Sequence, residues 1–182
     1  RFGDCTPLLS AEPGQFVMLR GPWGTDPLLP RAFSILRVSP AGELELLVKA
    51  MGKATRRLLA ARPGERYDLL GPLGSHFAPL APDARCVRVA GGVGLAPLVF
   101  FAERAASAGR ARHLRLLYGG RTRNDLVLGE RIGATGIECE RVTQDGSQGE
   151  RGMVTGVLAR ELSSPTVVFA CGPEGMLIAV AR

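Results

Sequence analysis

Short apolar runs separated by proline and glycine occupy the chain up to about residue 80. They lie in EPGQFVMLRGPWG, LPRAFSILRVSPAGELELLVKAMG and RPGERYDLLGPLGSHF. Runs of this length, with turn residues at this spacing, predict short strands in a small antiparallel barrel or sandwich. A single helix is expected over residues 53–61, where Leu58 and Leu59 provide a buried edge.

The pattern changes at Cys86, after which apolar strand-like runs alternate with glycine turns and helix-like segments. This alternation predicts an α/β domain with a parallel sheet covered on both faces, whose ligands bind at the carboxyl ends of the strands. We therefore expect two domains, residues 1–82 and 83–182, joined near LAPDA (80–84). The expected strands are CVRVAGG, HLRLLYGG, IECERVTQDG and TVVFACG, and the expected helices are APLVFFAERAASAG, NDLVLGERI, MVTGVLARELS and GMLIAVAR.

Composition and charge narrow the classes of function. The 182 residues are 46% hydrophobic and 22% charged, as in a soluble globular protein. Their net charge of +6 comes almost entirely from arginine, because Lys49 and Lys53 are the only lysines, and a guanidinium suits phosphate or carboxylate partners. Acidic and basic residues are interspersed, and no apolar run approaches the roughly 20 residues that span a bilayer. Neither a nucleic acid nor a membrane is an expected partner.

The cysteines and histidines offer no obvious metal or hydrolytic site. Four cysteines are scattered without a C-x-x-C pair: Cys5, Cys86, Cys139 and Cys171. This spacing argues against a disulfide framework and against a metal site built from this chain alone, and it favours a reducing cytoplasm. His76 and His113 stand alone, and no Ser-His-Asp or paired-carboxylate arrangement is visible.

The turn after the first parallel strand is rich in glycine, AGGVGLAPL (90–98). Gly91, Gly92 and Gly94 allow the backbone to bend and to approach a ligand closely, and Pro97 suits the first turn of a helix. Free N–H groups at that helix start favour a diphosphate. The turn is neither a complete G-x-G-x-x-G fingerprint nor a P-loop. It predicts a nucleotide site, with a purely structural turn as the alternative.

Three further motifs fall near the same sheet edge, each with two interpretations. The fourth strand ends in ACGPEGML, where Cys171 and the glycine after it could let a flat ring lie against the backbone, or could simply be a buried thiol and a turn. In TQDGSQG, Asp145 could accept bonds from ribose hydroxyls or could form an Asp-Gly turn. Arg121 and Arg123 could pair with a ribose phosphate, which leaves NADPH open as a donor, or could be solvated.

The first half offers a second anion site. PRAFSIL (30–36) places a cation, a ring and a hydroxyl in one strand, at Arg31, Phe33 and Ser34, although a half-buried strand with one polar face would look the same. KAMGKATR (49–56) ends a strand and opens a helix, where N–H groups and the Thr55 hydroxyl could bind a phosphate. Two nucleotide sites in one small chain suggest electron transfer between them.

In this order, the motifs PRAFS, GKAT, GPLGSHF, GGVGLAPL, TQDGSQG and ACGPEGML resemble the ferredoxin reductase-like flavoproteins. The closest likeness is to the electron transfer subunits of NAD-linked (class B) dihydroorotate dehydrogenases. The resemblance covers essentially the whole chain, and it implies an N-terminal FAD-binding antiparallel β-barrel and a C-terminal NAD-binding α/β domain.

The resemblance also implies roles for individual residues. Arg31 would pair with the FAD diphosphate, Phe33 would lie against the flavin, and Ser34 would bond near its N5 edge. Ala32 and Ala54 stand where the family has proline and glycine, and both are small enough for FAD to be retained. Leu47, Val48 and Lys49 would line the cofactor, and Ala54 and Thr55 would hold the diphosphate. Gly92, Gly94 and Pro97 would form the NAD(H) loop, with Cys171, Gly172 and Pro173 beside the nicotinamide. Ser34 and Cys171 are therefore the candidate catalytic residues.

The implied partner is an FMN-containing catalytic dihydroorotate dehydrogenase subunit, in an expected heterotetramer that serves pyrimidine biosynthesis. Net electron flow would run from dihydroorotate to NAD. The family also carries a cysteine-rich C-terminal segment that binds a two-iron, two-sulfur cluster. The 182 residues do not contain such a segment, so either it belongs to a longer chain or the protein lacks the cluster. Three alternatives stay open: a reductase subunit of a hydrogenase or glutamate synthase-like complex, a stand-alone flavin reductase, and a non-catalytic nucleotide-binding module.

Overall fold

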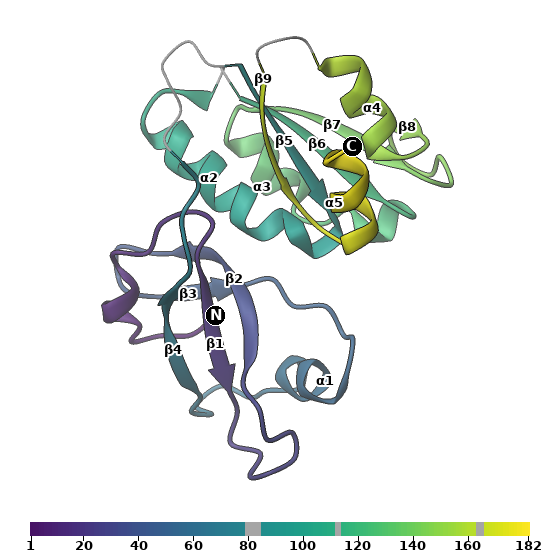
Figure 1. Cartoon of the computed structure of the whole chain (residues 1–182). Coiled ribbons are helices and arrows are strands. Elements are labelled where there is room, and N and C mark those ends of the chain that lie inside the picture. Colours follow the sequence, from purple (N-terminus) through teal and green to yellow (C-terminus); the bar gives the residue numbers. More distant parts are fainter. Residues whose placement is uncertain (79–84, 112–113, 163–165) are drawn as a thin grey trace. The chain divides into compact units, whose positions relative to one another are not determined.

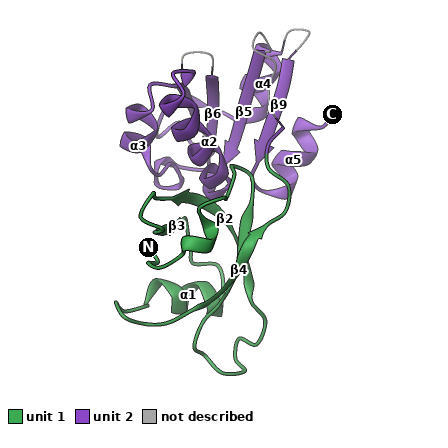
Figure 2. Ribbon diagram, turned by 90° about the vertical axis from the view of Figure 1, so that its left-hand side faces the viewer, with its two compact units in different colours: residues 1–76 green, residues 77–182 purple. Residues whose placement is uncertain are grey.

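The computed structural model describes residues 1–78, 85–111, 114–162 and 166–182. The chain divides into two compact units, Arg1–His76 (unit 1) and Phe77–Arg182 (unit 2), which Figure 2 colours separately. The boundary expected after residue 82, and the whole of the expected linker 80–84, lie outside the described residues.

Unit 1 is built on one four-stranded antiparallel sheet with the strand order β3-β2-β1-β4 (Figure 1). Alternation sets its inner face. In β1, for example, Val17 and Leu19 are buried while their neighbours are not. This antiparallel sheet confirms the predicted class of the N-terminal half. Its elements are β1 (Phe16–Arg20), β2 (Arg31–Val38), β3 (Leu44–Leu46), α1 (Lys53–Leu59), β4 (Asp68–Leu73) and the 3-10 turn η1 (Thr6–Leu8).

The predicted helix after the third strand is confirmed as α1, which buries Ala54 and Leu58. The expected burial of Leu59 is wrong, because this side chain lies on the outer face of the helix and is 57% exposed. It has no regular strand directly before it, because β3 ends at Leu46 and residues 47–51 run irregularly to the helix. The expected strand through Lys49 is therefore wrong in its last residues.

Unit 2 is a five-stranded parallel sheet with the order β8-β7-β6-β5-β9. It confirms the predicted α/β class. Strands β5 (Arg85–Gly91) and β6 (Leu114–Gly120) bury nearly all their side chains, as expected for strands covered on both faces. Its strands are β5 (Arg85–Gly91), β6 (Leu114–Gly120), β7 (Glu138–Thr143), β8 (Glu150–Arg151) and β9 (Thr166–Cys171). Its helices are α2 (Leu95–Ser107), α3 (Gly129–Ala134), α4 (Val154–Glu161) and α5 (Glu174–Val180), with the 3-10 turns η2 (Gly92–Gly94) and η4 (Arg123–Asp125).

Helices α2 and α3 lie on one face of this sheet, and α4 and α5 lie on the other (Figure 2). On the α4 face, Val87 and Val89 of β5 pack with Val157 and Leu158 of α4 in a buried apolar cluster. The strand residue between the two valines, Arg88, points to the α2 face, where its guanidinium carbon lies 4.0 Å from the centre of the Phe101 ring.

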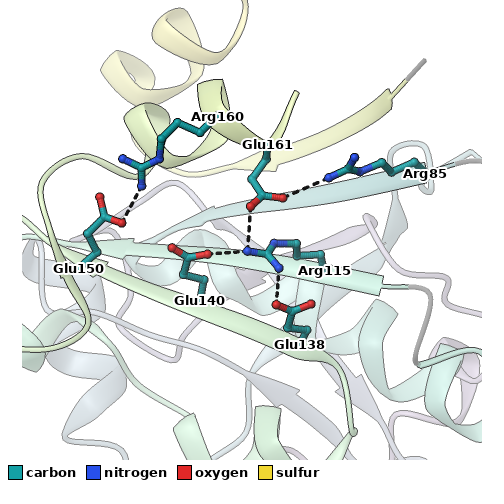
Figure 3. A network of polar contacts seen from close by, with 7 residues as sticks. All are labelled: Arg85, Arg115, Glu138, Glu140, Glu150, Arg160 and Glu161. Atoms are coloured by element: carbon teal, nitrogen blue, oxygen red, sulfur yellow. Dashed lines mark hydrogen bonds and ion pairs between the residues drawn. The ribbon is translucent and has the colours of Figure 1, made fainter. Parts of the chain in front are cut away.

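An ion-pair network fixes the C-terminal end of α4 over the first residues of three strands (Figure 3). The Glu161 carboxylate accepts from Arg115 of β6 at 2.8 Å and from Arg85 of β5 at 3.3 Å. Arg115 also pairs with Glu140 at 2.6 Å and with Glu138, both on β7. These residues lie at the amino ends of the parallel strands, whereas the glycine turn lies at their carboxyl ends.

Two sequence expectations in unit 2 need correction. The segment NDLVLGERI is not one helix, since η4 ends at Asp125 and α3 begins only at Gly129. Leu128 between them has a φ of +60°, which a continuous right-handed helix does not allow. The short strand β8 was not expected at all, because the two residues Glu150 and Arg151 carry no apolar signal.

Candidate functional site

The carboxyl edge of the unit 2 sheet brings the glycine turn and the C-G-P motif together, although 78 residues of sequence separate Gly94 from Gly172. β5 and β9 are neighbouring parallel strands, with Ala90 opposite Cys171. A Cβ atom on Gly94 would lie 2.2 Å from the carbonyl oxygen of Cys171, and one on Gly91 would lie 2.7 Å from Cδ of Pro173. These glycines therefore permit backbone-to-backbone packing of the two motifs. They were expected to let the turn bend and approach a ligand, with a purely structural turn as the alternative, and this packing between the two motifs was not foreseen.

Gly92 is the glycine of this turn that faces open space. Its φ of +52° suits glycine, and a Cβ there would meet nothing within 4 Å. The following residue, Val93, is 43% exposed. Pro97 is buried in the first turn of α2, as predicted. The turn thus leads directly into the start of α2, where the Leu95 N–H bonds to the Gly92 carbonyl within η2. A glycine turn that opens a helix is an arrangement that favours a phosphate.

Cys171 is half-buried at the end of β9, and burial raises the pKa of its thiol. It therefore stays protonated at neutral pH and is a poor nucleophile. A small neutral side chain beside Gly172 and Pro173 fits contact with a ring better than covalent chemistry, and its role stays a prediction.

Asp145 forms the Asp-Gly turn that was predicted as the structural alternative to a contact with ribose. Its Oδ1 accepts from the Ser147 N–H at 2.9 Å and from the Ser147 hydroxyl at 2.6 Å, and these bonds lower the pKa of the Asp145 carboxyl. The Ser147 oxygen in turn accepts from the Arg123 N–H at 2.7 Å. The loops after β6 and β7 are therefore one hydrogen-bonded structure. Arg121, expected as a phosphate or solvent contact, pairs with Asp125 at 3.2 Å.

In unit 1, the residues of PRAFSIL lie at the start of β2. The Arg31 side chain is exposed, and its Nη1 donates to the carbonyl oxygens of Leu29 and Pro30 at 2.8 and 3.2 Å. Because side chains alternate along a strand, Arg31 and Phe33 lie on one face of the sheet, and Ala32 and Ser34 lie on the other. The four predicted side chains are neighbours but do not share a face.

The start of α1 holds the second predicted group. The Thr55 hydroxyl accepts from the N–H groups of Met51 and Gly52 at 2.9 and 3.0 Å and lies 3.1 Å from the Gly52 carbonyl. It is thus occupied as a helix cap, which leaves the N–H groups of Lys53 and Ala54 as the donors suited to a diphosphate. Sequence reasoning gave this task to the N–H groups and the Thr55 hydroxyl together, and the role of the hydroxyl stays a prediction.

Asp26 fastens the loop before Arg31 to this helix. Its carboxylate pairs with the Lys53 ammonium group and its carbonyl accepts from Arg57. The hydrogen bond from Lys53 lowers the pKa of Asp26. The segments that carry Arg31 and the start of α1 are thereby held in one region of unit 1.

Exposed apolar side chains accompany these polar groups. Leu28 is 56% exposed, Leu29 is 67% exposed, and Met51 is 75% exposed. A cation, free N–H groups and exposed apolar side chains fit a ligand that joins a diphosphate to flat rings, as FAD does. Lys49 is also exposed. By contrast, Leu47 and Val48 line a cavity of about 1320 Å³ in unit 1 whose lining does not include residues 31–34, all of them described.

Comparison with known proteins gives a consistent family. The model of the oxidoreductase NAD-binding domain matches residues 89–182. The dihydroorotate dehydrogenase B (NAD(+)) electron transfer subunit of Geobacillus kaustophilus is 37% identical over 94% of this chain and 66% of its own length. The same subunit of Bacillus velezensis is 35% identical over 94% of this chain and 67% of its own.

The chain belongs to this family of electron transfer subunits. A solved structure of an NADH-dependent reduced ferredoxin–NADP oxidoreductase, described in connection with flavin-based electron bifurcation, is also similar. It has a TM-score of 0.77 and 26% identity, over 92% of this chain and 60% of that one. The recognised resemblance and the FAD- and NAD-binding ferredoxin reductase fold are thus confirmed. The chain spans just under two thirds of the Geobacillus relative.

Family membership does not supply a metal site within the described residues. No group of three or more His, Cys, Asp or Glu side chains in those ranges could hold a metal ion. Cys5 lies in unit 1, and the other three cysteines lie on different strands of unit 2. His113 lies outside the described residues. In the same ranges, no helix is both long and apolar enough to cross a bilayer.

Sequence reasoning missed two buried residues near the glycine turn. Tyr118 has 0% exposure and a hydroxyl with several backbone partners. Arg88 is 1% exposed, and none of its three guanidinium nitrogens has a hydrogen-bond partner among the described residues. Burial lowers the pKa of Arg88. The position of Arg88 as a single arginine inside the apolar run CVRVAGG could have indicated its unusual burial. Nothing in the sequence indicated the role of Tyr118.

Proposed function

We propose that this chain is the FAD-containing electron transfer subunit of an NAD-linked dihydroorotate dehydrogenase. It would pass electrons between NAD(H) and an FMN-containing catalytic subunit, in the service of pyrimidine biosynthesis. The observation that carries the proposal is the likeness to named electron transfer subunits over more than nine tenths of the chain. The packed glycine and C-G-P motifs support the NAD(H) half of it.

In unit 1, the exposed guanidinium of Arg31 would bind the FAD diphosphate, with the N–H groups of Lys53 and Ala54 as further donors. Phe33 and the exposed leucines before Arg31 would cover the rings. Ser34 would present its hydroxyl near the flavin edge. Bound FAD would supply the redox chemistry, which is the exchange of a hydride with a nicotinamide and of single electrons with the partner's redox centres.

In unit 2, the turn from Gly92 to Gly94 and the start of α2 would bind the NAD(H) diphosphate. The segment Cys171–Pro173 would hold the nicotinamide. The raised pKa of the Cys171 thiol keeps that side chain neutral beside a ring whose charge changes in the reaction. No general acid or base is needed, since a direct hydride transfer moves no separate proton.

The iron–sulfur cluster stays a prediction for the whole protein, because the described residues offer no ligand set for it. The partner stays a proposal as well. The likeness to a ferredoxin–NADP oxidoreductase favours one second candidate, a reductase subunit of related fold that serves a different partner.

The first experiment is a visible spectrum of the purified chain with added FAD, followed by anaerobic addition of NADH. We expect a flavin spectrum that bleaches on NADH addition. Arg31→Ala should weaken FAD binding by roughly 10- to 100-fold, the value of a charge-assisted hydrogen bond. Arg66→Ala, which changes another exposed arginine of unit 1, should not. FAD affinity unchanged by Arg31→Ala would contradict the role given to that residue, and failure to bind FAD at all would contradict the proposal.

A second measurement separates the partners. A purified FMN-containing dihydroorotate dehydrogenase catalytic subunit should co-elute with the full-length protein and should reduce NAD when dihydroorotate is supplied. Reduction of free acceptors by NADH, with no complex formed, would instead favour a stand-alone reductase.

A further inference from the structure

Tyr118 connects two loops at the carboxyl edge of the unit 2 sheet. Its side chain is completely buried in β6. The hydroxyl oxygen accepts from the Val127 N–H at 3.1 Å and lies 2.9 Å from the carbonyl oxygen of Asp125 and 3.3 Å from that of Gly92. A phenol has one proton, so it donates to one of these carbonyls at a time. One buried group thus bonds the loop after β6 and also reaches the glycine turn after β5.

The course of the 121–127 loop depends on this hydroxyl. Residues 126–128 are not helical, so the Val127 N–H has no helical acceptor and uses Tyr118 instead. A buried donor that loses its acceptor carries the full cost of its desolvation. Burial raises the pKa of Tyr118, so the hydroxyl keeps its proton through the physiological range.

The contact with Gly92 helps to orient the peptide between Gly92 and Val93, whose carbonyl also accepts from the Leu95 N–H. In a trans peptide, the carbonyl of one residue and the N–H of the next point in opposite directions. The Gly92 carbonyl points inward, toward Tyr118, so the Val93 N–H points away from the core. Val93 is 43% exposed, and Gly92 has open space beside it. Tyr118 therefore helps to aim an N–H donor outward at the place where a diphosphate would bind.

We propose that Tyr118 is a positioning residue of the dinucleotide site, whose hydroxyl holds the glycine turn and the 121–127 loop in the arrangement that binds NAD(H). Because the side chain is buried, it acts through Gly92 and Val127 and does not touch the nucleotide. The inference rests on the proposed function, in that it assumes the glycine turn binds NAD(H).

Tyr118→Phe tests this, with Tyr67→Phe as the matched control. Tyr67 is the other tyrosine of the chain, and its hydroxyl donates to Glu65 in unit 1. The probe is NAD⁺, titrated by calorimetry into the FAD-loaded full-length protein. We expect the Kd of Tyr118→Phe to rise about tenfold, as for loss of one hydrogen bond in the site. Tyr67→Phe should match wild type. The rate of flavin reduction at saturating NADH should change less than about twofold, since binding and not chemistry is affected.

An unchanged Kd for Tyr118→Phe would overturn the inference, as would a fall in the saturating rate without a change in Kd. Wild-type protein that binds FAD but neither NAD⁺ nor NADH would overturn the proposed function instead. If Tyr118→Phe does not fold, hydrogen exchange of the wild type decides. NAD⁺ should slow hydrogen exchange of the Val127 amide together with that of the amides of residues 92–94. An exchange rate at Val127 that does not change when NAD⁺ is added would contradict the coupling.

Discussion

Gly94 lies where a methyl group would collide with backbone, because its Cβ would be 2.2 Å from the carbonyl oxygen of Cys171. That oxygen cannot swing aside as a side chain could, so Gly94→Ala must push α2 or β9 away. We expect a loss of about 1–3 kcal/mol in the free energy of unfolding, as for other overpacked sites. Calorimetric melting of the purified variant measures it. Binding of NAD⁺ should weaken as well.

Gly156→Ala is the matched control for this change. Gly156 lies inside α4, and a Cβ there would meet nothing within 4 Å. Alanine should therefore stabilise the helix by about 0.5–1 kcal/mol. A Gly94→Ala variant that melts at the temperature of Gly156→Ala would show that the two motifs are not packed as described.

The same residues show what the sequence could predict at this scale. It located the glycine turn and the C-G-P motif correctly at one sheet edge, since both follow parallel strands. It could not show that Gly94 packs against Cys171, because β5 and β9 become neighbours only in the folded sheet. The partners of the Thr55 and Tyr118 hydroxyls could not be foreseen for a related reason, since they are backbone groups, which every residue has.

At the scale of elements, α4 is fastened to the sheet by charge as well as by apolar packing (Figure 3). The Glu161 side chain is 19% exposed and faces two arginines, Arg85 and Arg115. Glu161→Gln removes that charge, and we expect it to lower the free energy of unfolding by about 1–2 kcal/mol, between the values for exposed and buried pairs. Urea unfolding followed by circular dichroism measures this.

Glu150→Gln breaks a second pair in the same region and serves as the comparison. Glu150 and Arg160 are 42% and 61% exposed at their side chains, so solvent screens this pair and its loss should change the free energy of unfolding much less than the loss of Glu161. Equal losses in the two variants would mean that the position of Glu161 between two strands adds nothing.

Element types followed well from the sequence, because apolar period and glycine turns are local signals. The buried runs of β5 and β6 and the helices α1 and α2 were all expected. The failures have non-local causes. Residues 124–132 have helical composition, yet Tyr118 binds the Val127 N–H and the helix starts only at Gly129. β8 exists through its pairing with Val142 and Thr143 of β7.

Each unit has buried apolar residues of its own, and this has a consequence for the whole molecule. Unit 1 buries residues such as Val17 and Ile35, and unit 2 has its own cluster around Val89 and Leu117. The sequence predicted two domains of these classes. It gave no direct evidence that each domain could unfold, or be stabilised by a ligand, independently of the other. Such independence depends on how contacts are distributed in the folded chain.

We expect FAD to stabilise unit 1 and NAD⁺ to stabilise unit 2. Trp23, the single tryptophan, lies in unit 1 against Tyr67, so its fluorescence follows that unit. Most of the helical residues described belong to unit 2, so the circular dichroism at 222 nm mainly follows the unfolding of unit 2. A ligand at 100 times its Kd stabilises the unit that binds it by about 2.7 kcal/mol. FAD should therefore move the fluorescence transition, and NAD⁺ should move the dichroism transition.

Arg31→Ala gives this experiment its control, because it should abolish the shift caused by FAD and leave the shift caused by NAD⁺ intact. If either ligand moves both transitions together, the units unfold as one cooperative block and the buried apolar residues of each are not enough for independence. If FAD moves only the dichroism signal, the flavin site does not lie in unit 1. The assignment of cofactors to units therefore depends on which optical signal each ligand shifts.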